Sequence, residues 1–152
     1  MILGGVAALL VGSTVWLAVL VHGQHARNSN RDAALGRAQQ IITDYATYDY
    51  QHVDAQLQHL GTELRGPLKT QQDQARSAIV KFLQQGKATA KSQVVSIAVN
   101  FQTGNQVSVT AVVDQTVVNT ALPKGKLNRY RFHVVLSKDH GHWYATTLDP
   151  QA

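Results

Sequence analysis

Three segments of the chain repeat their hydrophobic positions at helical spacing. Apolar and aromatic side chains recur every three or four positions over residues 31–48, and the same period continues over residues 53–60. A third series runs from Pro67, a residue suited to the first turn of a helix, to Leu83. The pattern predicts three helices, the second ending at Gly61 and the third at Gln84-Gln85-Gly86.

Beyond Lys91 the hydrophobic period shortens to two, which is typical of strands. In the first of these segments the apolar face consists of Val95, Ile97, Val99 and Phe101. Similar alternation recurs over residues 107–118, 129–136 and 143–148, with turn residues at 103–105, 123–126 and 139–141. Helices followed by a run of antiparallel strands indicate an α+β fold, in which three helices pack on one face of a curved four-stranded sheet.

The start of the chain differs from the rest in polarity. The first 26 residues contain no Asp, Glu, Lys or Arg, and from Met1 to Val21 only Ser13 and Thr14 are polar. Twenty-one helical residues span about 31 Å, which matches the hydrocarbon core of a bilayer. A cleaved signal peptide has a basic start and a shorter apolar stretch, and a soluble core helix at a terminus carries more charge. We therefore expect a transmembrane anchor at residues 1–22, a linker at 23–30 and one domain at 31–152.

Two features of the predicted anchor bear on its contacts and its orientation. Gly4, Ala8 and Gly12 share one face of a helix, where small side chains allow another transmembrane helix to approach. Small residues are also common in membrane helices generally, so both interpretations stay open. Arg27 and Arg31 follow the helix, and the positive-inside rule alone would place the domain in the cytoplasm.

Composition excludes some chemistry and leaves other possibilities open. The chain has no cysteine, which rules out disulfides, thiolate metal sites and a cysteine nucleophile. Its 14 basic and 9 acidic residues give a net charge of +5, a balance that affects solubility more than it specifies a function. The charges are segregated: residues 44–63 hold four carboxylates and no base, whereas residues 124–138 hold five bases and no acid. Such patches either steer docking to a partner or form an ordinary solvated surface.

The sequence contains no nucleophile-elbow, zinc-protease, Walker or dinucleotide-binding motif. His52 and His59 lie two helical turns apart, about 10 Å, which is too far to share a metal ion. His140 and His142 flank a glycine in a turn without a third ligand in the pattern. We therefore expect no metal site, no cofactor and no catalytic residues.

A group of polar and aromatic residues lies at the end of the first predicted helix and just beyond it. Its members, Tyr45, Tyr48, Asp49, Tyr50 and His52, are candidates for lining a pocket or contacting a partner. Tyr, Asp and His can perform acid–base chemistry in the cavity of a small α+β fold. However, Tyr45, Tyr48 and His52 also form a helical stripe, and such stripes are more often part of a core. We expect packing rather than catalysis.

Nucleic-acid binding is not expected from the basic strand at residues 129–132. Successive side chains of a strand point to opposite faces, so Tyr130 and Phe132 would not share a surface with Arg129 and Arg131.

Four short segments resemble the Mce-associated membrane proteins, accessory proteins of actinobacterial mammalian-cell-entry lipid importers. They are residues 44–50 (DYATYDY), 109–117 (VTAVVDQTV), 129–132 (RYRF) and 139–144 (DHGHWY). The chain differs from the family in two places. Residues 65–68 read RGPL where the family often has a Thr-Gly-aromatic element, and the basic segment expected before the anchor is missing.

The resemblance implies a nuclear-transport-factor-two-like domain held outside the cytoplasmic membrane by one N-terminal helix. It further implies a non-catalytic accessory subunit that stabilises or assembles a lipid or sterol importer, with Mce-type proteins or the permease as partners. Two alternatives remain open. One is an anchored pocket domain that binds or turns over a small ligand, and the other is a secretion-system scaffold of the same fold.

Overall fold

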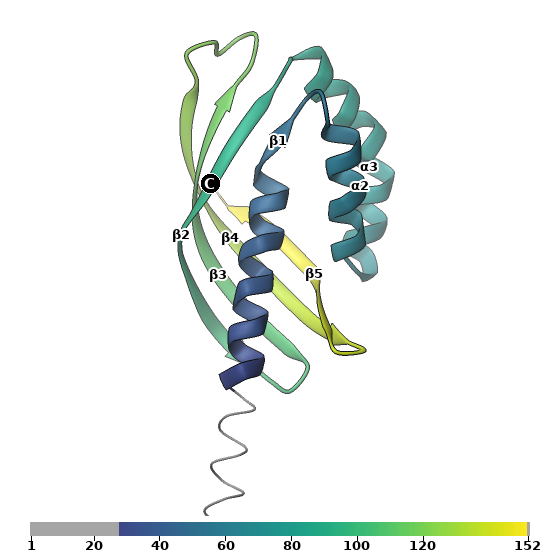
Figure 1. The fold of residues 1–152 in the computed structure, drawn as a ribbon, viewed down its shortest axis with the longest axis vertical. Coiled ribbons are helices and arrows are strands. Elements are labelled where there is room, and N and C mark those ends of the chain that lie inside the picture. Colours follow the sequence, from purple (N-terminus) through teal and green to yellow (C-terminus); the bar gives the residue numbers. More distant parts are fainter. Residues whose placement is uncertain (1–27, 152) are drawn as a thin grey trace, which may run out of the picture. The chain divides into compact units, whose positions relative to one another are not determined.

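The structure, a computed structural model, describes residues 28–151 of the chain (Figure 1). The chain is helical over residues 28–46 and then forms β1 (Tyr48–Asp49), α2 (Val53–Glu63), α3 (Gly66–Gln85), β2 (Thr89–Gln102), β3 (Gln106–Val118), β4 (Lys126–Asp139) and β5 (His142–Gln151). Among the described residues, no helix is both long enough and apolar enough to span a membrane.

The predicted anchor at residues 1–22, with Gly4, Ala8 and Gly12, lies outside the described residues. Residues 23–27 of the predicted linker (23–30) also lie outside the described residues. Residues 28–30 are helical, so the first helix already includes three residues that we assigned to the linker.

The strands form one antiparallel sheet in the order β1-β2-β3-β4-β5, and the helices cover one side of it (Figure 1). The α+β class and the meander of four long strands are confirmed. The prediction of only four strands is wrong, because Tyr48 and Asp49 pair with Ala90 and Thr89 as a fifth, two-residue strand. Two residues are too few to show a period, so the pattern could not reveal β1.

The core lies between the sheet and the first helix. The side chains of β3 and β4 that face the helices are almost completely buried, from Val107 to Val113 and from Phe132 to Leu136. The helix contributes Ala34, Ala38, Ile41, Ile42 and Ala46 at three- and four-residue spacings. The small alanines let the helix lie close to the sheet, and the two isoleucines fill the remaining space. Strand alternation and helical periodicity together therefore produce one continuous apolar layer.

We predicted that the first helix ends at Tyr48, but it ends at residue 46. A buried side chain from the sheet explains the difference: the amide Nε2 of Gln115 on β3 donates a hydrogen bond of 2.7 Å to the carbonyl oxygen of Ala46. This bond satisfies one of the carbonyls left free at a helix end. Thr47 leaves the helix and its hydroxyl meets that of Ser92 at 2.7 Å, which leads the chain into β1.

Three other expectations about single residues are wrong. Gly61 does not end α2, which continues to Glu63; Gly61 is buried where Gln72 of α3 comes so close that an added Cβ would lie 3.1 Å from the Oε1 of Gln72. Val95 and Phe101 are not part of the inward face of β2. The pairing with β3 skips Val95 and, further along, Asn100, and the two bulges leave the side chain of Val95 52% exposed and that of Phe101 46% exposed.

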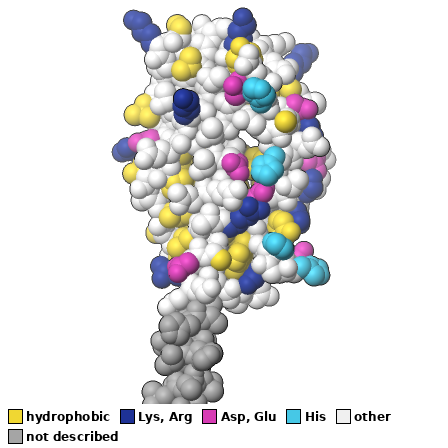
Figure 2. All heavy atoms as spheres, viewed as in Figure 1, with side chains coloured by type: hydrophobic (Ala, Val, Ile, Leu, Met, Phe, Trp, Pro, Cys, Tyr) yellow, Lys and Arg dark blue, Asp and Glu magenta, His cyan; other side chains and the backbone are white. Residues whose placement is uncertain are grey.

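The surface of the domain carries charges of both signs. On the face shown in Figure 2, histidine side chains lie close to acidic ones. Contacts of this kind include His59 with Glu63 and His52 with Asp49, with nitrogen and oxygen 3.7 Å apart in both.

Candidate functional site

An apolar cavity of about 220 Å³ is bordered by the end of the first helix, α2, α3 and β3. Its apolar lining comes from Val53, Leu57, Ile79 and Leu83 together with the rings of Tyr45 and Tyr48. Its polar lining comes from Asp44, Thr47, Gln56 and Gln115. The helices hold this space open because α2 and α3 pack on each other and on the sheet edge through a small second cluster around Val53 and Leu83.

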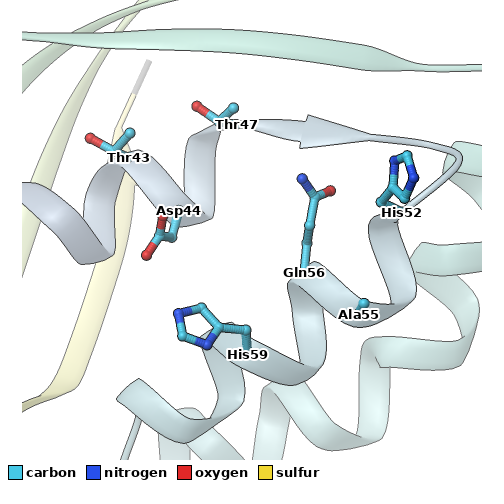
Figure 3. Close-up of a pocket in the computed structure, with 7 residues that line it drawn as sticks. All are labelled: Thr43, Asp44, Thr47, His52, Ala55, Gln56 and His59. Atoms are coloured by element: carbon cyan, nitrogen blue, oxygen red, sulfur yellow. The ribbon is translucent and has the colours of Figure 1, made fainter.

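A more open groove of about 390 Å³ shares Asp44, Thr47 and Gln56 with the cavity (Figure 3). In Figure 3, Asp44 points from the first helix toward α2, where His59 lies opposite to it. Gln56 projects from α2 toward β1 and separates this part of the groove from His52. The polar groups therefore line the open groove, whereas the enclosed cavity is mostly apolar.

Hydrogen bonds from α2 and from Asp49 fix the turn between β1 and α2. The amide oxygen of Gln56 accepts a bond of 2.9 Å from the backbone N–H of Asp49. The Asp49 carboxylate accepts a bond of 3.0 Å from the backbone N–H of Gln51, and its other oxygen lies 3.7 Å from Nδ1 of His52. Asp49 thus has a local structural role, as aspartates often have in turns.

The structure separates the five residues that the sequence singled out. Tyr45 and Tyr48 line the cavity, and His52 lines the groove with its side chain 72% exposed. Asp49 and Tyr50 are not among the residues lining either space; the backbone N–H of Tyr50 donates instead to the carbonyl of Ala88 at 3.0 Å. A tyrosine, a carboxylate and an imidazole therefore do not converge on one point.

The comparisons with known proteins concern the fold. No family model matches this sequence, and no curated protein matches it. Among solved structures, the periplasmic domain of DotI superposes with a TM-score of 0.65 at 11% identity, covering 79% of this chain and 94% of that one. CagV, a VirB8 homologue of the type IV secretion system of Helicobacter pylori, gives 0.62 at 7% identity, covering 79% and 97%. An IcmL-like type IV secretion system protein of Legionella pneumophila gives 0.63 at 10%, covering 77% and 88%.

The fold is nuclear-transport-factor-two-like. In this chain the cone of the nuclear-transport-factor-two-like fold is the space between the helices and the curled sheet. The apolar cavity occupies its β1 end. A neighbouring hollow of about 240 Å³ has Tyr130, Phe132 and Pro150 in its wall and shares Tyr45 and Gln115 with the cavity. Tyr45 therefore borders both spaces.

The environment of the cone favours the neutral forms of its tyrosines. Partial burial raises the pKa of Tyr45, which is still 42% exposed, and the negative charge of Asp149 raises it further. The pKa of Tyr48 is raised by burial and by proximity to Tyr130. At neutral pH both phenols keep their protons and offer hydrogen-bond donors, and a raised pKa makes a phenolate base less accessible.

These shifts predict a loss of stability at alkaline pH. When a folded-state pKa is raised above its unfolded value near 10, the unfolded chain loses its proton first as the pH rises. The free energy of unfolding should therefore fall above about pH 10. Urea denaturation at neutral pH and at pH values above 10 measures this, and a Tyr45→Phe/Tyr48→Phe variant should fall less. An equal fall in the variant would contradict the assignment to these two residues.

Metal ligation finds no support in the described part of the chain. No group of three or more His, Asp or Glu side chains in residues 28–151 is arranged to hold an ion. His52 and His59 lie along the same groove, whereas His140 pairs with the neighbouring Asp139 at 2.7 Å.

Several residues of the site escaped prediction. Gln56 and Gln115 position the end of the first helix and β1, and both contribute to the cavity wall. A signal for Gln115 did exist: it continues the inward series of β3 after Ala111 and Val113, so a polar side chain had to enter the core. Gln56 carried no such signal, because it is one of several polar side chains spaced along α2, together with Asp54, Gln58 and His59.

Proposed function

We propose that this chain is a non-catalytic scaffold subunit of a secretion-type membrane machine, with its domain outside the cytoplasm. The observation that carries the proposal is the fold, which the chain shares over more than three quarters of its length with the periplasmic domain of DotI and with CagV. The non-catalytic part is supported by the placement of the residues that the sequence singled out, since Tyr45 and Tyr48 line the cavity, His52 lines the groove and Asp49 holds a turn.

The proposal includes a single-pass anchor in the cytoplasmic membrane at residues 1–22, and it rests there on the uncharged run of the sequence. Service to a lipid or sterol importer, with Mce-type proteins or a permease as partners, stays a prediction drawn from the four segments that resemble the Mce-associated proteins. The two versions share the architecture and differ in the partner proteins.

Affinity purification of the full chain, tagged at its C-terminus, from native membranes tests the proposal. We expect several membrane proteins of one secretion-type apparatus to co-purify, and deletion of the gene to lower their levels. A chain lacking residues 1–22 is the matched control and should recover fewer of them. Recovery of importer subunits instead would replace the secretion version by the importer version. If no membrane protein co-purifies and no partner level changes, the scaffold role is wrong.

A further inference from the structure

Five lysines from two distant parts of the sequence converge at one end of the domain. We call this end the lysine tip and define it by Lys81, Lys87, Lys91, Lys124 and Lys126. The loop after α3 and the β3–β4 connection are joined by a hydrogen bond of 3.0 Å from the Thr120 N–H to the Gly86 carbonyl. Strand pairing brings Thr89 of β2 opposite Val118 of β3, and Lys126 of β4 opposite Val117.

The charge of the lysine tip is not neutralised within the domain. From Gln74 to Lys138 the sequence has nine basic residues and one acidic residue, Asp114. Both oxygens of Asp114 are occupied by Arg129, at 2.6 and 2.8 Å. Within residues 28–151 none of the five tip lysines forms an ion pair, so they present a concentrated positive potential to solvent.

Large apolar side chains are exposed among these lysines. Phe82 on α3 is 73% exposed and Leu127 on β4 is 64% exposed, while Leu122 in the β3–β4 connection is 39% exposed. In Figure 2, hydrophobic and basic side chains lie together at the end of the domain that carries the β3–β4 connection. Phe82 follows Lys81 in the chain, Leu127 follows Lys126 and Leu122 lies two residues before Lys124, so the tip offers apolar side chains directly beside its charges.

We propose that the lysine tip binds the surface of an anionic phospholipid bilayer. All five cations are lysines, a residue type depleted in protein–protein interfaces, where arginine predominates instead. The compact ammonium group is suited to the diffuse charge of lipid phosphates, which demands no planar, bidentate geometry. Phe82 and Leu127 come from different elements, and such separate apolar points can enter the headgroup region of a bilayer.

This inference goes beyond the proposed scaffold function and does not depend on it. The lysine tip belongs to residues 81–127, so its affinity for lipid is a property of the domain whatever proteins the chain assembles with. If the affinity purification recovered no partner, the lipid-binding inference would be unaffected. If the tip did not bind lipid, the scaffold proposal would be unaffected.

The test uses the full chain held in nanodiscs of neutral phosphatidylcholine, which occupy any membrane-inserting segment. These particles are mixed with vesicles of phosphatidylcholine alone or with phosphatidylglycerol, and binding is followed by co-sedimentation. We expect binding only to the vesicles that contain phosphatidylglycerol, weakening as salt is added.

Two double variants that remove the same charge separate the tip from net charge. Lys124→Gln/Lys126→Gln should lower the affinity for phosphatidylglycerol vesicles about 30-fold, because each lysine near an anionic surface contributes about fivefold. The control Lys69→Gln/Lys138→Gln removes two lysines outside the tip and should change the affinity less than about twofold. Leu127→Ser should lower it about fivefold, and this loss should persist at high salt.

Three outcomes would overturn the proposal. The first is equal binding to both kinds of vesicle. The second is an equal loss of affinity for phosphatidylglycerol vesicles in the two double variants. The third is no binding to either kind, which would leave an acidic protein surface as the occupant of the tip.

Discussion

Phe132→Ala should lower the free energy of unfolding by about 3–4 kcal/mol, the largest loss that we expect from one substitution. Phe132 lies on the interior strand β4, is 2% exposed and meets the ring of Tyr45 edge-on, with the centroids 5.8 Å apart. Truncation removes this aromatic contact and the burial of the ring, and it leaves a void in the core. The expected loss lies in the lower part of the range for phenylalanine, because the ring also borders the hollow beside Tyr45, which water can enter.

Phe82→Ala is the matched control for this prediction. It makes the same chemical change at a side chain that is 73% exposed, so its cost should stay below about 0.5 kcal/mol. Urea denaturation of the full chain in detergent, followed by circular dichroism, measures both variants. Similar losses in the two variants would mean that Phe132 is not a core residue.

The regular part of the fold follows from local patterns in the sequence. Strands β3 and β4 have one buried and one solvated face, and their alternation is therefore clear enough to predict the core positions. The stripe of the first helix is equally clear from Leu35 to Tyr45. In both cases the signal arises from neighbours within a few residues of one another.

The sequence misled us where a distant side chain decides the structure. Gln115 ends the first helix from a position 69 residues away, and the approach of α3 explains why Gly61 lies inside α2. The candidate site suffers from the same limitation. Tyr45 and Tyr48 were found because they continue a helical stripe, but Gln56 and the lysine tip depend on contacts between elements that no local pattern contains.

The ion pair between Arg37 and Glu63 is another such contact, and Arg37→Ala should lower the free energy of unfolding by about 3 kcal/mol. Arg37 Nη2 lies 2.5 Å from Oε2 of Glu63, whose side chain is only 6% exposed. The same guanidinium donates through Nε to the carbonyl oxygen of Trp143 at 3.3 Å, and thus connects the first helix, α2 and β5. Its removal leaves a carboxylate that is buried and without its nearest cation, which costs more than the ion pair itself contributes.

Arg76→Ala is the matched control, since Arg76 pairs with Asp54 at 2.8 Å but the Asp54 side chain is 62% exposed. Water can solvate that carboxylate, so the loss should stay below about 1 kcal/mol. A third variant, Arg37→Ala/Glu63→Leu, removes the buried charge as well and should regain part of the stability lost in Arg37→Ala. If the double variant is less stable than Arg37→Ala, the cost comes from lost packing of the arginine stem and not from an uncompensated charge. Denaturant titration of all three variants at neutral pH therefore decides whether this pair holds the two helices to β5 by electrostatics.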